Sequence, residues 1–186
     1  EPYRELAYDG VEVPYVTKFY DNTVICYSYS KSLSLPGERI GYLVIPDVFK
    51  DSEEVFGAAV IANRVLGSVN APSLMQRVIM RCIDSKVNLE AYDKNRNLLY
   101  NGLKELGFSC VKPQGAFYLF VKSPEPDEKA FCAACKKHNI LVVPGSSFAC
   151  PGFVRISYCV SYNQIERSLP AFRKVAQEYG LCEKGE

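Results

Sequence analysis

The stretch that decides the fold reads Ser28-Tyr-Ser30-Lys31-Ser-Leu-Ser-Leu-Pro-Gly37-Glu-Arg39-Ile-Gly41. It follows an apolar run, residues 24–29, that is typical of a short buried β-strand. The strand therefore delivers Lys31 into a loop that contains serines, a glycine and Arg39. Serine hydroxyls, loop amides and a guanidinium are the groups that hold a phosphate in proteins. The stretch thus predicts an anion-binding loop with a lysine beside it.

Lys31 has two interpretations when it is considered alone. Most lysines lie in solvated loops, and that is the ordinary expectation for Lys31 too. An amine next to another cation, however, is a good nucleophile toward an aldehyde. A small molecule that carries both an aldehyde and a phosphate is pyridoxal 5′-phosphate, so the loop suits that cofactor.

The whole stretch resembles the lysine-bearing segment of the class I and II aminotransferases, which are fold type I pyridoxal-phosphate enzymes. The family pattern is Ser-x-Ser-Lys-x-(aromatic or Leu)-(Ser or Gly)-x-x-Gly-x-Arg-x-Gly. It is matched by Ser28, Ser30, Lys31, Leu33, Ser34, Gly37, Arg39 and Gly41. The resemblance implies that Lys31 is the catalytic residue, which forms a Schiff base with the cofactor and moves a proton during the reaction. It also implies that Ser28, Ser30 and Arg39 contact the cofactor phosphate.

Three further segments resemble the same family, in the same order along the chain. Residues 1–6 look like the end of the family's Asp-x-x-Tyr strand, which implies that Tyr3 bonds the ring oxygen of the cofactor. The aspartate of that motif is expected one residue before Glu1. Residues 113–118 are similar to the entry into the small domain. Residues 144–157 resemble the closing motif, except that Ala149 stands where the family usually has glycine.

Arg155 lies in this last motif, within the apolar strand pattern of residues 154–158. An unpaired charge in such a strand is costly, so the guanidinium needs an anionic partner. Its planar fork fits a carboxylate with two hydrogen bonds. The residues alone leave open a structural ion pair with an Asp or Glu. The resemblance implies that Arg155 binds the α-carboxylate of the substrate.

The hydrophobic pattern predicts an α/β fold with the following organisation. Strands are expected at 24–29, 40–45, 108–111, 116–121, 141–143 and 154–158, and helices at 53–66, from Ser73, at 87–106, 127–138 and from Ser161 to Tyr179. The resemblance implies the C-terminal part of the fold type I enzymes: the end of the large-domain mixed sheet, then a smaller α+β domain. Residues 1–66 are assigned to the large domain, 67–106 to interdomain helices and 107–186 to the small domain.

The composition limits the other possibilities. The net charge of +1 argues against a nucleic-acid-binding surface spread over the chain, and no apolar run reaches the ~20 residues of a membrane helix. The eight cysteines are interpreted as reduced core residues. Cys132, Cys135 and His138 suggest a metal site, but a structural zinc site needs four ligands, so no metal is expected.

The expected function is that of a pyridoxal-phosphate-dependent aminotransferase, which moves an amino group between an amino acid and a 2-oxo acid. Because the first residue is Glu1 and the resemblance covers only part of the enzyme, the chain is expected to be an inactive piece of a longer, cytoplasmic, homodimeric protein. Residues 68–73 look like the family segment near the dimer interface. Two alternatives stay open: another fold type I enzyme (a β-lyase, decarboxylase or synthase), or the aminotransferase-like domain of a transcription regulator.

Overall fold

The computed structural model describes residues 1–183 and divides the chain into two compact units. The first unit is Glu1–Val87 and the second begins at Asn88. Residues 67–106 are expected from the sequence to form a separate interdomain segment. In the structure helix α3 (Ser73–Cys82) belongs to the first unit, whereas α4 (Leu89–Glu105) belongs to the second, where it packs on α6 (Tyr162–Glu178).

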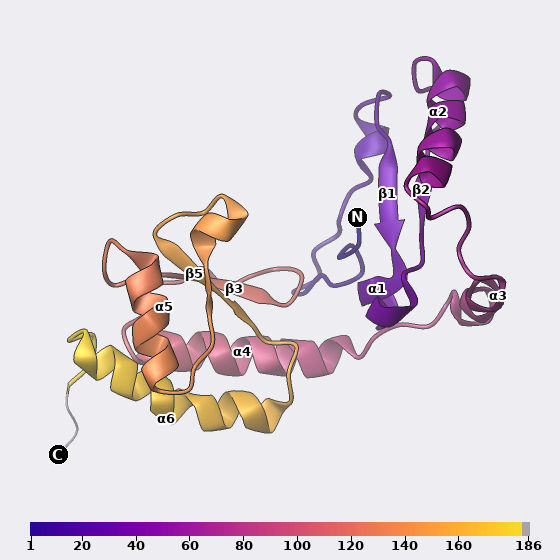
Figure 1. Cartoon of the computed structure of the whole chain (residues 1–186). Helices are drawn as coiled ribbons and strands as arrows, with labels where there is room; N and C mark the ends of the chain where they lie inside the picture. Colours follow the sequence, from indigo (N-terminus) through magenta and orange to yellow (C-terminus); the bar gives the residue numbers. More distant parts are fainter. Residues whose placement is uncertain (184–186) are drawn as a thin grey trace. The chain divides into compact units, whose positions relative to one another are not determined.

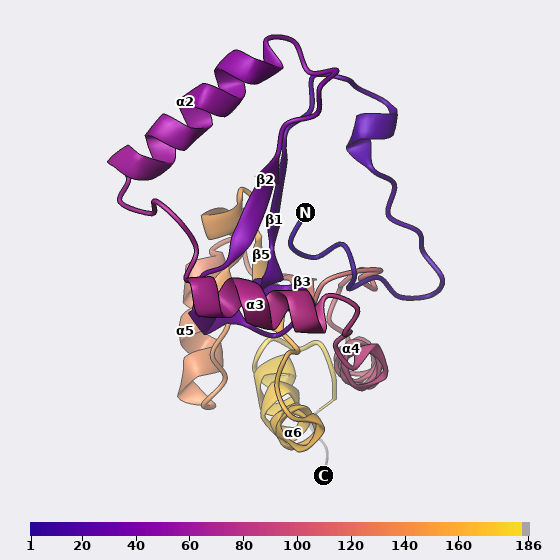
Figure 2. The same cartoon turned by 90° about the vertical axis from the view of Figure 1, so that its right-hand side faces the viewer.

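The first unit contains a strand pair and three α-helices. A 3-10 helix (η1, Val16–Lys18) precedes β1 (Ile25–Ser28), which continues directly into the one-turn helix α1 (Tyr29–Ser32). A second 3-10 turn (η2, Pro36–Glu38) leads to β2 (Gly41–Val44), and α2 (Ser52–Val65) and α3 follow. Figure 2 shows β1 and β2 side by side, with α2 and α3 after them.

β1 and β2 pair antiparallel, with Ser28 opposite Gly41 and Ile25 opposite Val44. The apolar runs predict that both strands are buried, and this is wrong: no residue of β1 is buried, and the four residues of β2 are all exposed. The apolar positions of the predicted helix at 53–66 also suggest an inner face that includes Phe56 and Val60, but both residues are exposed and no residue of α2 is buried. An apolar run becomes buried only where other elements cover both faces of its sheet. Within residues 1–87 the sheet has two strands, and α2 buries no side chain against it.

Ser73 and Gln76 have the spacing of a capping box, which predicts the start of a helix there; helix α3 does begin at Ser73, but without that cap. Pro72 is the N-cap residue, and Ser73 is already the first helical residue. The Gln76 side chain donates a hydrogen bond to the carbonyl oxygen of Ala71 at 2.7 Å. Pro72 is not helical, with a ψ of 130°, whereas Ser73 already is, so the boundary falls at the proline and not at the serine.

The second unit is a three-stranded antiparallel sheet with three helices. After α4 the elements are β3 (Tyr118–Lys122), α5 (Glu128–Lys137), β4 (Val143–Pro144), a 3-10 turn (η3, Gly145–Phe148), β5 (Phe153–Ser157) and α6. β5 is the central strand, between β3 and β4. The predicted strand at 108–111 is reduced to a single bridge between Cys110 and Val121.

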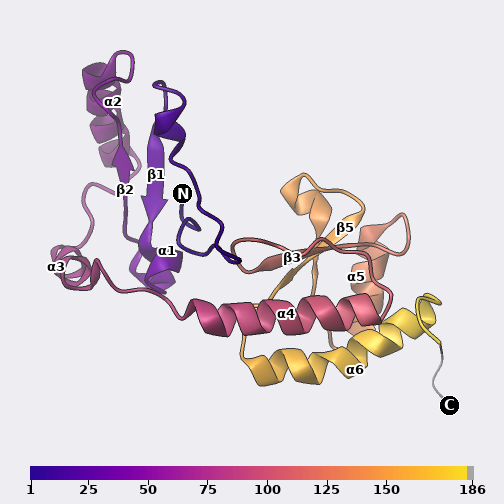
Figure 3. The same ribbon diagram turned by 180° about the vertical axis from the view of Figure 1, so that it is seen from behind.

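The sheet of the second unit has one buried face and one open face. Leu119 and Val121 of β3 and Val154 and Ile156 of β5 are buried, and they alternate with half-exposed residues along both strands. Figures 1 and 3 show α4 and α6 side by side along the sheet. The apolar residues between Ile165 and Tyr179 have the spacing of one helical stripe, and this prediction is confirmed: Ile165, Phe172, Val175 and Ala176 are buried. The open face carries the side chains that matter for the site.

Two other expectations concern the described residues. All eight cysteines are free thiols, but Cys135 is the only one that is buried, so most of them are not core residues. Among residues 1–183 no helix combines the length and the apolar character that a membrane span requires.

Candidate functional site

Lys31 lies in the one-turn helix α1, which begins directly where β1 ends. Ser28 is extended and caps α1: its hydroxyl oxygen accepts a hydrogen bond from the backbone N–H of Ser30 at 3.2 Å. The Ser28 hydroxyl also donates to the Ser30 hydroxyl at 2.9 Å. Lys31 lies in the middle of this turn and is half-buried. The structure therefore brings the two serines together directly before the lysine.

The backbone around Arg39 lies against the end of β1, although Arg39 is eight residues after Lys31 in the sequence. The backbone N–H of Tyr29 donates to the carbonyl oxygen of buried Ile40 at 3.2 Å, which places the Arg39–Gly41 segment against the end of β1. Arg39 adopts a left-handed conformation at φ 52°, and its guanidinium donates to the Pro36 carbonyl at 2.7 Å. η2, which Arg39 terminates, contacts α1.

Gly41 has a steric reason for being glycine. A Cβ at this position would overlap the carbonyl oxygen of Tyr27 and approach the Cα of Ser28 to 3.2 Å. β2 can therefore pair this closely with the strand that leads to Lys31 only without a side chain at position 41. The last glycine of the sequence pattern is thus a requirement of the strand pairing.

The segment that carries Tyr3 lies close to the same strand. Tyr3 is half-buried in a turn, where the backbone N–H of Leu6 donates to its carbonyl oxygen at 2.9 Å. Two residues later, Glu5 accepts a hydrogen bond from the hydroxyl of Tyr27 in β1 at 2.7 Å. Tyr3 and Lys31 therefore belong to segments that both join β1.

These residues fit the cofactor that the sequence analysis expected. Two hydroxyls lie 2.9 Å apart at the end of β1, the backbone next to the exposed Arg39 pairs with the same strand end, and this donor set suits a phosphate group. The amine of Lys31 follows the serines by one residue. The chain thus supplies phosphate donors and a primary amine in one loop of the first unit.

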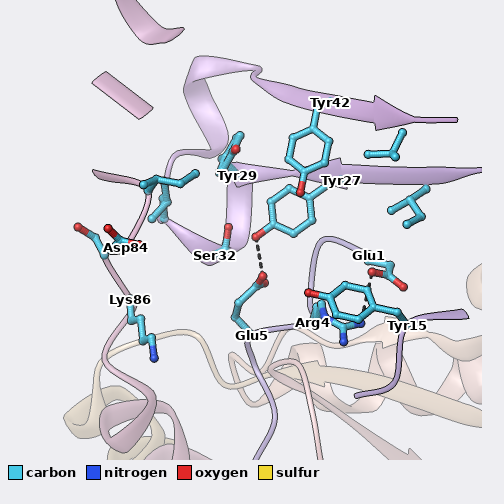
Figure 4. A pocket seen from close by; sticks show the side chains of 15 residues that line it. Glu1, Arg4, Glu5, Tyr15, Tyr27, Tyr29, Ser32, Tyr42, Asp84 and Lys86 are labelled. Carbon is cyan, nitrogen blue, oxygen red and sulfur yellow. Dashed lines mark hydrogen bonds and ion pairs between the residues drawn. The ribbon is translucent and has the colours of Figure 1, made fainter. Parts of the chain in front are cut away.

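A tyrosine cluster next to this loop was not predicted. The first unit contains a cavity of about 670 Å³, whose 15 lining residues include Tyr27, Tyr29 and Tyr42 but not Lys31. The rings of Tyr27 and Tyr42 stack with centroids 4.9 Å apart, and Tyr29 meets Tyr27 edge to face at 5.3 Å. Figure 4 shows these rings, with the Tyr27 hydroxyl directed toward Glu5. Tyr27 and Tyr29 alternate in the sequence, which is a signal for such a cluster. Tyr42 can be recognised as their partner only from the strand register, which sets it opposite Tyr27.

The phenols of this cluster stay protonated over the physiological range. Burial raises the pKa of Tyr27 well above its ordinary value, and the hydrogen bond to Glu5 raises it further. Burial also raises the pKa values of Tyr29 and Tyr42. The three side chains therefore form a cluster of neutral aromatic rings.

Arg155 lies on the open face of the sheet in the second unit. It is half-buried in the central strand β5, opposite Phe120 of β3 and Val143 of β4. The guanidinium carbon lies 4.1 Å from the centroid of the Tyr118 ring and 3.6 Å from that of Phe148. The structural ion pair that the residues alone left open is not found among residues 1–183, where the recorded partners of Arg155 are these two rings.

The loop before β5 is compact and tightly fixed. Gly145 is buried, and a Cβ there would overlap the carbonyl oxygen of Cys150 and lie 2.7 Å from that of Phe153. Ala149 adopts the left-handed conformation at φ 54°, so alanine keeps the backbone conformation for which glycine is usual. Glu128 accepts a hydrogen bond from the backbone N–H of Gly152 at 3.1 Å. Hydrogen bonds from Ser146 and Gly152 lower the pKa of the Glu128 carboxyl.

The cysteine and histidine residues of α5 do not form a metal-ligand cluster. The Nε2 atom of His138 pairs with the carboxylate of Glu178 at 2.7 Å. Burial raises the pKa of the Cys135 thiol to about 12, which makes it a poor metal ligand. In the part of the chain that the structure describes, no group of three or more His, Cys, Asp or Glu residues could hold a metal ion.

Comparison with known proteins identifies relatives for nearly the whole chain. The family model of aminotransferase class I and II matches residues 1–172. The chain is 28% identical to aromatic-amino-acid aminotransferase 2 of Thermococcus litoralis, over 97% of this chain and 49% of that protein. It is 30% identical to an aspartate aminotransferase of Thermotoga maritima, over 91% of this chain and 44% of that protein. The chain thus spans about half the length of the curated relatives it matches.

Solved structures agree with this result. A crystal structure of an aminotransferase from Eubacterium rectale superposes with a TM-score of 0.92 at 54% identity, covering 96% of this chain and 45% of that one. An aspartate aminotransferase of Thermus thermophilus gives a TM-score of 0.81 at 27% identity, over 94% and 47% of the two chains. The expected α/β fold of the fold type I enzymes is confirmed, and members of this group use pyridoxal phosphate. The chain belongs to the aminotransferase class I and II family.

Proposed function

We propose that these residues act within a pyridoxal-phosphate-dependent aminotransferase that transfers an amino group between an amino acid and a 2-oxo acid. One observation carries the proposal: the hydroxyls of Ser28 and Ser30 meet at the end of β1, directly before Lys31, and the backbone next to Arg39 pairs with the same strand end. The names of the relatives, aromatic-amino-acid and aspartate aminotransferases, favour transamination over the β-lyase, decarboxylase and synthase alternatives.

The cofactor would be held by residues of the first unit. Ser28 and Ser30 donate hydroxyl hydrogen bonds to its phosphate, and Arg39 supplies the positive charge. Tyr3 donates its phenol hydrogen to the ring oxygen. Pyridoxal phosphate, when bound, supplies an electron sink for the bond that breaks at the α-carbon of the substrate.

The chemical work of the chain then falls to two side chains. The fork of Arg155 binds the α-carboxylate of the amino acid and orients it, without transferring a proton. The amine of Lys31 takes the proton from the α-carbon of the amino acid and later returns a proton, as a general base and acid. Lys31 alone among the residues that we assign moves protons.

We further propose that the active protein is longer than this chain and works as a cytoplasmic homodimer. The relatives are about twice as long, so the 186 residues by themselves should be inactive. Exposed apolar side chains along α2 and the following loop, among them Phe56, Val65 and Val69, suit a surface that a second subunit covers. The substrates are small molecules, and neither a nucleic acid nor a membrane is expected as a partner.

The assignment of Lys31 can be tested without an activity assay. The full-length protein is loaded with pyridoxal phosphate, reduced with borohydride and digested, and the peptides are analysed by mass spectrometry. We expect the cofactor mass on the peptide that contains Lys31, and none in the Lys31→Ala variant. Modification of Lys50, which is exposed after β2, serves as the control for unspecific labelling. Label on other lysines, or none on Lys31, would overturn the proposal.

A further inference from the structure

Two aromatic rings lie close to the Arg155 guanidinium. Its central carbon is 4.1 Å from the centroid of the Tyr118 ring, from β3, and 3.6 Å from that of the Phe148 ring, at the end of η3. The two rings come from segments that are thirty residues apart in the sequence. Rings over a guanidinium attract it through their negative faces, and more strongly where water is excluded.

The sheet register explains how this arrangement is built. Phe120 stands directly opposite Arg155, and Tyr118 stands opposite Ser157, so Tyr118 is the diagonal neighbour of Arg155 on the open face. A diagonal neighbour in an antiparallel pair is within reach of aromatic and long side chains. Phe148 closes the arrangement from the loop, where its ring meets that of Phe120 edge to face at 6.3 Å.

The rings also restrict where a ligand can approach. The N–H groups of a guanidinium point outward within its plane, whereas the two rings contact its central carbon, so a carboxylate would bind at the N–H edge. Within residues 1–183 the recorded contacts of the Arg155 guanidinium are with the two rings, and no carboxylate there forms an ion pair with it. A carboxylate from outside these residues would meet a flat fork that is already oriented.

We propose that Tyr118 and Phe148 form an aromatic clamp, which positions Arg155 for in-plane, two-bond recognition of the substrate carboxylate. This proposal rests on the proposed function, because it names the residues that orient the carboxylate-binding arginine. Tyr118 and Phe148 are positioning residues, since they act on the ligand through Arg155. The clamp keeps the long arginine side chain in one orientation before the ligand arrives, which lowers the entropy cost of binding.

The loop that carries Phe148 is fixed on both sides, as a clamp requires. Glu128, at the start of α5, bonds the backbone N–H of Gly152 at 3.1 Å, and Ser146 also bonds its carboxylate. Within the loop, the backbone N–H of Cys150 donates to the carbonyl oxygen of Gly145 at 3.0 Å. These bonds fix the backbone of the loop that carries Phe148, a residue that is 40% exposed.

The test separates the aromatic ring from the volume of the side chain. In the full-length, cofactor-loaded protein, Phe148→Leu and Tyr118→Leu remove one ring each, whereas Phe148→Tyr and Tyr118→Phe keep it. Phe153→Leu is the matched control, because Phe153 lies on the same strand and the same face as Arg155 but has no recorded ring contact with it. The probe is succinate, a dicarboxylate that cannot undergo transamination, and its dissociation constant is measured by titration calorimetry.

We expect each ring-removing variant to raise the dissociation constant of succinate about threefold to tenfold, whereas the ring-keeping variants and the control stay within about twofold. KM for the amino acid should rise in parallel with kcat nearly unchanged, which a general loss of structure would not produce. Equal effects of Leu and aromatic substitutions at 148, or no binding of succinate to the unmodified protein, would overturn the clamp. Cofactor labelling of Lys31 stays intact in every variant, so failure of the clamp is distinguishable from failure of the proposed function.

Discussion

The buried amide of Asn95 offers a direct test of how β5 is held. Asn95 lies in α4, is only 5% exposed, and donates from Nδ2 to the carbonyl oxygens of Tyr158 at 3.0 Å and Val160 at 2.7 Å. These two residues follow β5, the strand that carries Arg155. We consider the substitution Asn95→Leu, which has a similar volume but cannot donate a hydrogen bond.

The expected loss follows from the two bonds. Each contributes about 0.5–1.5 kcal/mol net, and removal of a donor from a buried carbonyl costs more than the average because water does not replace it easily. Leucine favours the helix over asparagine by about 0.4 kcal/mol, which offsets a small part. We therefore expect Asn95→Leu to lower the free energy of unfolding by about 1.5–3 kcal/mol.

The assay is urea unfolding followed by far-ultraviolet circular dichroism, with Asn101→Leu as the matched control. Asn101 lies in the same helix but is exposed, so its substitution gains the same helix propensity without the loss of buried bonds. The control should change stability by less than about 0.5 kcal/mol. A difference between the two variants smaller than about 1 kcal/mol would show that the amide does not hold the end of β5.

Three further outcomes follow from the second unit. The pKa of Glu128 lies below its ordinary value of 4.5, so its stabilising bonds are present above that pH and are lost as the pH falls through the lowered pKa. When the free energy of unfolding is measured from about pH 6 to pH 3, it should therefore fall less in Glu128→Gln than in the unmodified protein. Gly145→Ala should cost at least about 2 kcal/mol of unfolding free energy, because the new Cβ meets the backbone carbonyl of Cys150; a stable variant would contradict the tight loop. At about pH 8 a thiol reagent should label exposed Cys159 at once, but not buried Cys135 until the protein unfolds, as mass spectrometry can show.

The parts of the structure that were predicted correctly depend on local signals. Ser161 caps α6 through a bond to the N–H of Gln164, and the apolar stripe of that helix is buried as its spacing indicated. The end of the strand before Lys31 was also predicted, since the change from apolar residues to serines marks where the strand ends. These features are fixed by residues within one or two turns of each other.

The features that were missed depend on residues far apart in the chain. The exposure of β2 is determined by what covers it, which the run from 40 to 45 does not encode. The aromatic clamp needs the register that sets Tyr118 diagonal to Arg155, and a single sequence shows only that both strands alternate. Alternation predicts the face on which a side chain lies, but not which neighbour it meets there.

The hydrophobic core is distributed very unequally between the two units. Among residues 1–183, the first unit buries the apolar side chains of Leu6, Tyr8, Ile40 and Ile79, while all the other buried apolar side chains lie beyond residue 88. Heat capacity rises on unfolding in proportion to the apolar surface that becomes newly hydrated. A calorimetric scan of this chain should therefore record a cooperative endotherm that comes almost entirely from the second unit, with the first unit melting over a broad range and adding little to the baseline step.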